Sequence, residues 1–136
     1  MNIETNFRQS KYCTAIENAM QTLGHATNLE LLAVLREQFP DVSATTVHRA
    51  TARLAQRGQL GLAPAGRDGS MRYDANVVPH DHFQCQRCFM LRDADIRDVV
   101  VPVIQVAIAD CEIGGRLVIS GLCKICKTFV KEEVGD

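Results

Sequence analysis

The clearest chemical signal in this 136-residue chain is a set of four cysteines arranged as two C-x-x-C pairs. Cys85 and Cys88 form the first pair, Cys123 and Cys126 form the second, and 34 residues lie between the pairs. Each pair can supply two thiolates from one turn, and two such turns complete the tetrahedral coordination that zinc prefers. Coincidental cysteines or a dithiol redox switch are the alternatives, and the paired spacing favours a structural zinc site.

Histidines and aspartates around the first cysteine pair indicate a second metal site. His80 and His82 are two residues apart, so both side chains point to one face of a strand. The candidate partners are Asp93, Asp74 at the end of a predicted hairpin, and His25 in a predicted turn between two helices. Imidazole nitrogen with carboxylate oxygen suits iron(II), manganese(II) or zinc(II). On spacing alone, a loop histidine and solvated carboxylates are the alternative.

The first half of the chain has the pattern of three helices. Apolar residues at helical spacing predict a helix over residues 12–23. Thr27 and Glu30 have the spacing of a capping box, which predicts a second helix over residues 29–35 that stops before Pro40. Ser43 is a good N-cap and Gly58 a good C-terminal residue for a third helix.

The third helix and the segment after it predict a surface that binds DNA. One stripe of the helix is apolar and expected to be buried: Ala44, Val47, Ala50 or Thr51, and Leu54. Residues 59–63 and 70–74 read as a hairpin, and three helices with a hairpin make a winged helix-turn-helix. Residues 43–73 carry five arginines and one acid, which suits a polyanion. The candidate DNA contacts are Thr45, His48, Arg49, Arg53 and Arg67. A solvated helix surface is the alternative.

The second half predicts a small α/β domain. Pro79 breaks regular structure, so we expect two domains, residues 1–76 and 77–136. Short strands are expected at 82–84, 89–91 and 117–119, around the cysteine pairs. Residues 95–109 fit either a strand or a helix, and Pro102 would kink a helix unless it lies in the first turn.

Composition is that of a soluble globular protein, with 46% hydrophobic and 23% charged residues. The first residues lack the apolar core of a signal peptide, and no apolar stretch is long enough to cross a membrane. We therefore expect a cytoplasmic protein with no membrane partner, where disulfides are rare. The remaining cysteines, Cys13 and Cys111, are expected to be buried as small hydrophobic residues.

The order of these motifs resembles the ferric uptake regulator family of dimeric bacterial metalloregulators. The resemblance runs through TTVHRATARLAQRGQL, MRYD, HDHFQC-x-x-C and GLCKIC, from about residue 12 to residue 127. It implies an α+β protein with an N-terminal winged helix-turn-helix domain and a C-terminal α/β dimerisation domain with structural zinc. It also implies a homodimer that binds a double-stranded DNA operator as a repressor.

By position, the resemblance makes five residues the ligands of a regulatory iron(II) or manganese(II) between the domains: His25, Asp74, His80, His82 and Asp93. Three histidines with two aspartates are most similar to the peroxide-sensing branch. There, iron(II) and hydrogen peroxide oxidise a ligand histidine, which implies His25 and His80 as the oxidation targets. An iron, manganese or zinc uptake regulator without peroxide chemistry is the nearest alternative.

The sequence departs from the family pattern at two places, and two other functional classes stay open. The family's N-terminal helix is not recognisable in MNIETNFRQSK, and His48 stands where the family usually has tyrosine. A metallohydrolase would use the histidine–aspartate site with an open water position, although no general base stands outside the proposed ligands. A purely structural zinc protein would bind one metal per chain.

Overall fold

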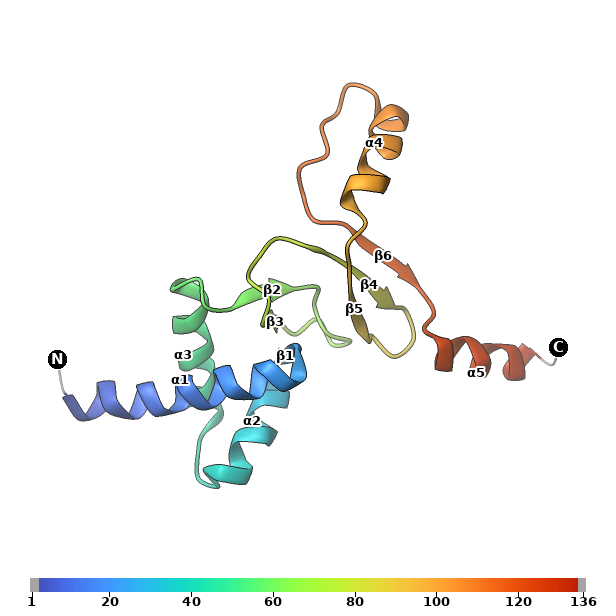
Figure 1. Ribbon diagram of the computed structural model, residues 1–136. Coiled ribbons are helices and arrows are strands. Elements are labelled where there is room, and N and C mark those ends of the chain that lie inside the picture. Colours follow the sequence, from blue (N-terminus) through green and yellow to red (C-terminus); the bar gives the residue numbers. More distant parts are fainter. Residues whose placement is uncertain (1–2, 135–136) are drawn as a thin grey trace. The chain divides into compact units, whose positions relative to one another are not determined.

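The structure, a computed structural model, describes residues 3–134. The chain divides into two units between Val78 and Pro79. The predicted domain boundary lies two residues earlier, after residue 76. Five helices and two three-stranded sheets make up the described residues, which confirms the predicted α+β class (Figure 1). Each unit has its own sheet, so each is described by itself.

Three helices pack together in the first unit: α1 (Ile3–Leu23), α2 (Asn28–Gln38) and α3 (Ala44–Gln56). On α1, Cys13, Ile16 and Met20 are buried at spacings of three and four residues, which gives the helix one core-facing stripe. The prediction placed its start near residue 12, and no helix was expected in the preceding residues. The helix begins at Ile3 instead, because polar residues can continue a helix without showing an apolar period.

The caps predicted for α2 and α3 are confirmed. The Thr27 hydroxyl accepts the Glu30 amide N–H, and the Glu30 side chain accepts the Thr27 amide N–H, so the capping box is complete. Ser43 caps α3 by accepting the Thr46 N–H. After α3, Gly58 has a φ of +72°, a conformation that glycine adopts without steric cost.

The predicted apolar stripe of α3 is confirmed except at its first residue. Val47, Ala50, Thr51 and Leu54 are all buried. Ala44 was expected to join them but is exposed, because a pocket between α2 and α3 leaves the first turn uncovered. The core of the unit therefore lies under the second and third turns of α3.

A small sheet completes the first unit, with strands β1 (His25–Thr27), β2 (Gly61–Ala63) and β3 (Arg72–Asp74). The predicted hairpin is confirmed, because β3 pairs antiparallel with β2 across residues 64–71, which we call the wing loop. Strand β1 pairs with the other edge of β3. His25 was predicted in a turn and lies in this strand instead. Three residues between two helices are too few to show a strand period.

The second unit holds β4 (Asp81–Cys85), β5 (Leu91–Ala94) and β6 (Val118–Gly121) in the order β5-β4-β6. Strand β4 pairs antiparallel with β5 and parallel with β6. The strand expected at residues 89–91 begins at Leu91 instead. Phe89, which has a φ of +64°, completes the turn from β4 and cannot extend the strand.

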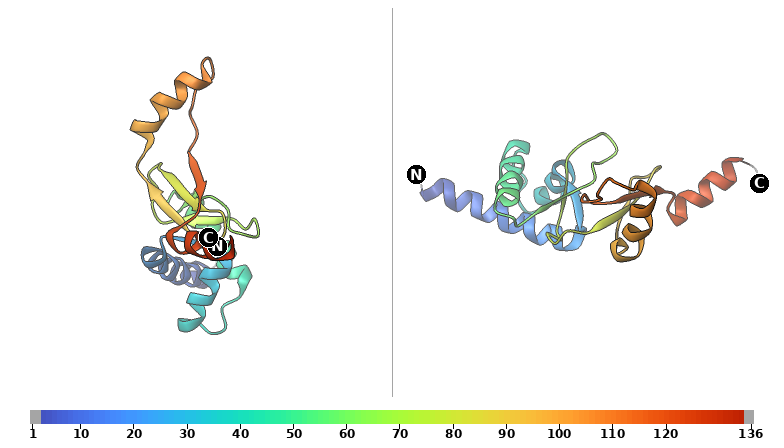
Figure 2. Two further views of the ribbon diagram at one scale, coloured as in Figure 1. Left: turned by 90° about the vertical axis from the view of Figure 1, so that its right-hand side faces the viewer. Right: turned by 90° about the horizontal axis from the view of Figure 1, so that it is seen from above.

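Residues 95–109, which fitted either structure, form helix α4 (Arg97–Ile108). Pro102 lies in its interior, where the missing N–H leaves the Asp98 carbonyl without its helical donor. No residue of α4 is buried, and Val103 and Val106 are 71% and 82% exposed. Two views show α4 and the loop after it projecting from the sheet (Figures 1 and 2). An unpredicted helix, α5 (Lys124–Val134), follows β6.

An ion pair with a buried carboxylate connects β4 to α4. The Asp81 carboxylate is 2% exposed and accepts hydrogen bonds from Arg97 Nη2 at 2.9 Å and from the Leu117 amide at 2.8 Å. Burial opposes ionisation of Asp81, but these donors outweigh it and lower the pKa of the carboxyl group. The pair therefore holds the start of β4 against the start of α4 and the segment that leads into β6.

No helix within residues 3–134 is both long enough and apolar enough to cross a lipid bilayer.

The core of the first unit gives a stability prediction. Leu54→Ala removes a fully buried side chain from α3 and should lower the free energy of unfolding by about 2–5 kcal/mol. Leu29→Ala is the matched control: its side chain is 74% exposed, so the change should stay within about 0.5 kcal/mol. Urea unfolding measures both. Equal effects of the two substitutions would contradict this assignment of the core.

Candidate metal centres and the outward face of helix α3

The four cysteines of the C-x-x-C pairs come together in the second unit. Cys85 ends β4 and Cys88 lies in the following turn, while Cys123 precedes α5 and Cys126 lies in its first turn. Their sulfur atoms all lie within 4.8 Å of one another, and the Cys88 and Cys123 sulfurs are 3.8 Å apart. We call these residues the cysteine cluster.

Backbone amides orient the sulfurs of the cysteine cluster. Cys85 Sγ accepts N–H groups from Cys88 at 3.5 Å and Cys123 at 3.4 Å, and these bonds lower the pKa of the Cys85 thiol to about 6. Burial, followed by hydrogen bonds with the other cysteines, raises the pKa of Cys126 to about 12. A thiol held that high ionises near neutral pH only when a cation offsets its charge.

The cysteine cluster fits zinc. With Zn–S bonds of about 2.3 Å, the sulfurs at two corners of a tetrahedron lie roughly 3.8 Å apart. The Cys88–Cys123 distance has this value. The amide-to-sulfur hydrogen bonds are the kind of outer contact that fixes metal ligands in place. The donor set and its spacing are therefore those of a structural zinc site.

In the first unit, His25 and Asp74 form a pair. They lie directly opposite one another on β1 and β3, with His25 Nε2 3.4 Å from Asp74 Oδ2. The Asp74 side chain is 2% exposed, and its other oxygen accepts the Asn76 N–H at 2.9 Å. Strand register thus gives the first unit one imidazole and one buried carboxylate side by side.

In the second unit, His80, His82 and Asp93 form a separate group, which we call the β4–β5 cluster. His82 lies opposite Asp93 in the register of β4 and β5. Asp93 Oδ1 is 3.1 Å from His80 Nε2 and 3.3 Å from His82 Nε2, so both imidazoles converge on one carboxylate oxygen. His82 is almost fully buried, whereas about half of the Asp93 side chain is exposed. Two imidazoles and a carboxylate at such distances can bind one divalent ion.

The predicted DNA contacts of α3 lie on its outward face. Thr45, His48 and Arg49 are exposed, while Arg53 is half-buried. These residues follow each other at helical spacing on the side opposite the buried stripe. The helix can therefore present several polar groups to one groove of DNA.

Two arginines in or beside the wing loop have different surroundings, because Arg67 is exposed and Arg72 is buried. Arg67 lies in the loop and is exposed, as a DNA contact requires. Arg72, part of the same basic segment, is 8% exposed and donates to the Pro64 and Ala65 carbonyls at 2.9 and 3.0 Å. Burial lowers the pKa of its guanidinium. Arg72 therefore braces the wing loop from inside, which its charge alone did not reveal.

Sequence reasoning missed one polar residue beside α3. Asn28, the first residue of α2, has its Nδ2 3.0 Å from His48 Nδ1 and its Oδ1 2.7 Å from the Thr51 hydroxyl. These residues are 20 and 23 positions away in the chain. Only the packing of α2 on α3 brings them together, so no local pattern could have identified the contact.

Comparison with known proteins identifies structures of the same architecture. A peroxide stress regulator from Campylobacter jejuni superposes with a TM-score of 0.69 at 16% identity, covering 93% of this chain and all of that one. The Helicobacter pylori ferric uptake regulator gives 0.67 at 19% identity, covering 86% of this chain and 80% of that one. The iron-bound regulator from Francisella tularensis gives 0.64 at 19% identity, covering 85% and 91%. These likenesses concern the fold.

The sequence comparisons give the family. No curated protein matches this chain in sequence. The model of the Ferric uptake regulator family matches residues 4–110, which is more than half of the chain and includes both histidine–aspartate groups and the first cysteine pair. The chain therefore belongs to the Ferric uptake regulator family.

Proposed function

We propose that this chain is a homodimeric repressor whose binding to operator DNA depends on a regulatory iron(II) or manganese(II). Members of its family are metal-responsive transcription regulators and not enzymes, so the metallohydrolase alternative is set aside. The observation that carries the metal dependence is the convergence of His80 and His82 on Asp93. The cysteine cluster is a separate donor set, which a purely structural zinc protein would have alone.

DNA binding is assigned to the first unit and dimerisation to the second. Thr45, His48, Arg49 and Arg53 on α3 would enter a major groove, with Arg67 of the wing loop on the phosphate backbone or the minor groove. Exposed apolar residues of the second unit support its role in dimerisation: Val99, Val103 and Val106 on α4 and Val118 and Ile119 on β6. Two-fold pairing through such residues would place two recognition helices, one α3 from each chain, about one helical turn apart or a close multiple.

The regulatory ion would take its ligands from both units. The β4–β5 cluster offers two imidazoles and a carboxylate, and the His25–Asp74 pair offers one of each. Together these groups make a nitrogen and oxygen donor set that suits iron(II) or manganese(II). An ion bound by residues from both units would favour the arrangement that binds DNA, provided that it has higher affinity for that arrangement. Zinc in the cysteine cluster would hold the second unit folded whether or not the regulatory ion is bound.

Peroxide sensing is the form of regulation that the ligand set supports best. Three histidines with two aspartates resemble the peroxide-sensing branch, and one structural relative is a peroxide stress regulator. Iron(II), if bound there, would activate hydrogen peroxide. One peroxide oxygen would add to a ring carbon of His25 or His80, the other would leave as water, and the oxidised imidazole would ligate the ion more weakly and so release the repressor from DNA. Regulation by iron, manganese or zinc uptake without this chemistry is the alternative.

The cysteine cluster is tested by Cys123→Ser, which should reduce the zinc content from about one ion per chain to near zero. Zinc binding contributes roughly 10 kcal/mol or more in zinc-finger peptides, so strands β4–β6 should lose protection from hydrogen exchange. Cys111→Ser is the matched control. Cys111 was expected to be buried but is exposed and outside the cluster, so its loss should change neither measurement. Full zinc content in Cys123→Ser would contradict the site.

The regulatory site is tested by Asp93→Ala and by His80→Ala/His82→Ala, with operator affinity measured by fluorescence anisotropy with and without manganese(II). The operator is a duplex enriched from a random pool by the metal-loaded wild type. We expect manganese to tighten wild-type binding by about 5- to 150-fold and to leave both variants unchanged. Asp95→Ala, an exposed carboxylate next to β5, should respond like the wild type. Variants that tighten with metal as the wild type does would refute the switch.

Peroxide sensing is tested by mass spectrometry of the iron(II)-loaded protein after brief exposure to hydrogen peroxide. We expect one added oxygen atom on the peptides that contain His25 or His80, together with loss of operator binding. The manganese-loaded protein is the control and should stay unmodified. Unmodified histidines in the iron form, with DNA binding retained, would favour a metal-uptake regulator.

A further inference from the structure

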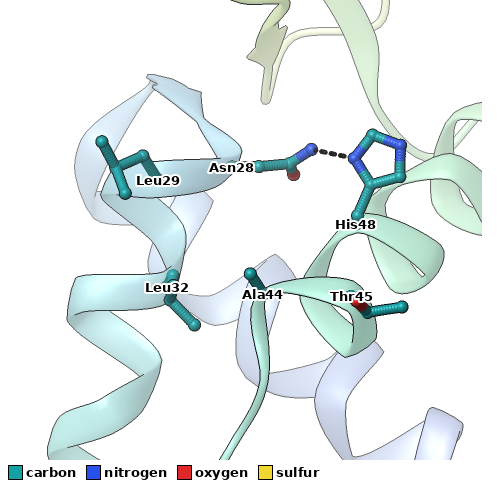
Figure 3. Close-up of a pocket in the computed structure, with 6 residues that line it drawn as sticks. All are labelled: Asn28, Leu29, Leu32, Ala44, Thr45 and His48. Atoms are coloured by element: carbon teal, nitrogen blue, oxygen red, sulfur yellow. Dashed lines mark hydrogen bonds between the residues drawn. The ribbon is translucent and has the colours of Figure 1, made fainter.

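A hydrogen-bond network between α2 and α3 connects Asn28 to His48 and Thr51 and orients the His48 ring. Asn28 and His48 both line a pocket of about 380 Å³ between α2 and α3. Figure 3 shows the two side chains facing each other. Asn28 Nδ2 and His48 Nδ1 are 3.0 Å apart, and the other ring nitrogen lies on the far side of the imidazole. His48 is exposed, and this hydrogen bond orients its ring.

The network also determines where the imidazole carries its proton. Thr51 is fully buried, and its hydroxyl lies 2.7 Å from Asn28 Oδ1, closer than the carbonyls of Val47 and His48 at 3.2 and 3.1 Å. This short distance is typical of an O–H···O bond, so the Asn28 oxygen is an acceptor and its NH₂ group donates to His48 Nδ1. An accepting Nδ1 carries no proton, so the neutral ring carries its proton on Nε2.

His48 therefore presents one hydrogen-bond donor at the outer face of the recognition helix. It is the fifth residue of α3, exposed, and on the same face as Thr45 and Arg49. Residues in the first half of a recognition helix reach base edges in the major groove. The acceptor that adenine and guanine share there is N7. An imidazole can both donate and accept hydrogen bonds, and the bond from Asn28 leaves His48 only a donor for the DNA.

We propose that Asn28 is a positioning residue for base recognition: through its bond to His48 Nδ1, it directs the Nε2–H of His48 to the N7 atom of one operator purine. The inference rests on the proposed DNA-binding function of α3. Asn28 would thus contribute to specificity from outside the recognition helix. The group that His48 contacts would be a purine acceptor in the major groove.

The experiment replaces each purine of an enriched operator duplex with its 7-deaza analogue, which lacks only the N7 acceptor. Metal-loaded wild-type protein should lose about 5- to 10-fold in affinity at the contacted position, the effect of one missing hydrogen bond. His48→Ala should bind the unmodified duplex about 5- to 10-fold more weakly and show no further loss with the analogue at that position.

Asn28→Ala is the decisive variant. It keeps the imidazole but removes the donor that orients it, so the 7-deaza penalty at the same position should shrink to less than about 3-fold. The double variant Asn28→Ala/His48→Ala should bind no more weakly than His48→Ala, because the two residues act as one unit. Asn18→Ala, an exposed asparagine on α1, is the matched control and should keep the full penalty. Thermal unfolding of each variant checks that the fold is retained.

The outcomes separate this inference from the proposed function. Failure of the metal-loaded wild type to enrich any duplex would remove the proposed function itself. A wild type that binds selectively, with the full 7-deaza penalty in folded Asn28→Ala, would overturn the role of Asn28. A contact that responds to methylphosphonate substitution of the backbone, and to no 7-deaza purine, would show that His48 binds a phosphate and would overturn base reading.

Discussion

The register of strand β4 is the constraint on which both donor groups of the second unit depend. Pairing with β5 places His82 opposite Asp93, and pairing with β6 places Cys85 opposite Gly121. A slip of one residue would turn the histidines to the other face and separate the first cysteine pair from the second. Gly121 itself allows the close approach of β6, because a Cβ there would lie 3.1 Å from the Phe83 ring. Asp81 and Arg97 hold the start of the same strand.

The two donor groups on β4 suit different tasks because their surroundings differ. The cysteine cluster joins the turn after β4 to the start of α5, so an ion there closes a loop within one unit and supports its fold. In the β4–β5 cluster, Asp93 is half exposed while His82 is buried. Its two imidazoles and one carboxylate would leave coordination positions of an iron(II) or manganese(II) ion open for further ligands. Sulfur and nitrogen–oxygen donors also differ in the metals that they favour.

Much of the architecture could be predicted because it depends on local chemistry. The hydrogen bonds of Thr27 and Ser43 and the backbone conformation of Gly58 mark helix ends. The spacing of the C-x-x-C pairs predicts how their thiolates bind a metal. Elements without a local signature were missed. Strand β1 is three residues long, the first turns of α1 show no apolar period, and α5 begins inside the last cysteine pair without a predicted start. The Asn28–His48 contact depends on the packing of two helices and has no sequence pattern.

The inward position of Arg72 has a consequence for the cost of binding. Its guanidinium ties the Pro64 and Ala65 carbonyls to β3, so the wing loop is ordered by the protein itself. A loop that is already ordered loses little conformational entropy on binding. More of the free energy of its contacts therefore contributes to affinity. The exposed Arg67 therefore lies on a loop that Arg72 holds in place, so its charge has a defined position.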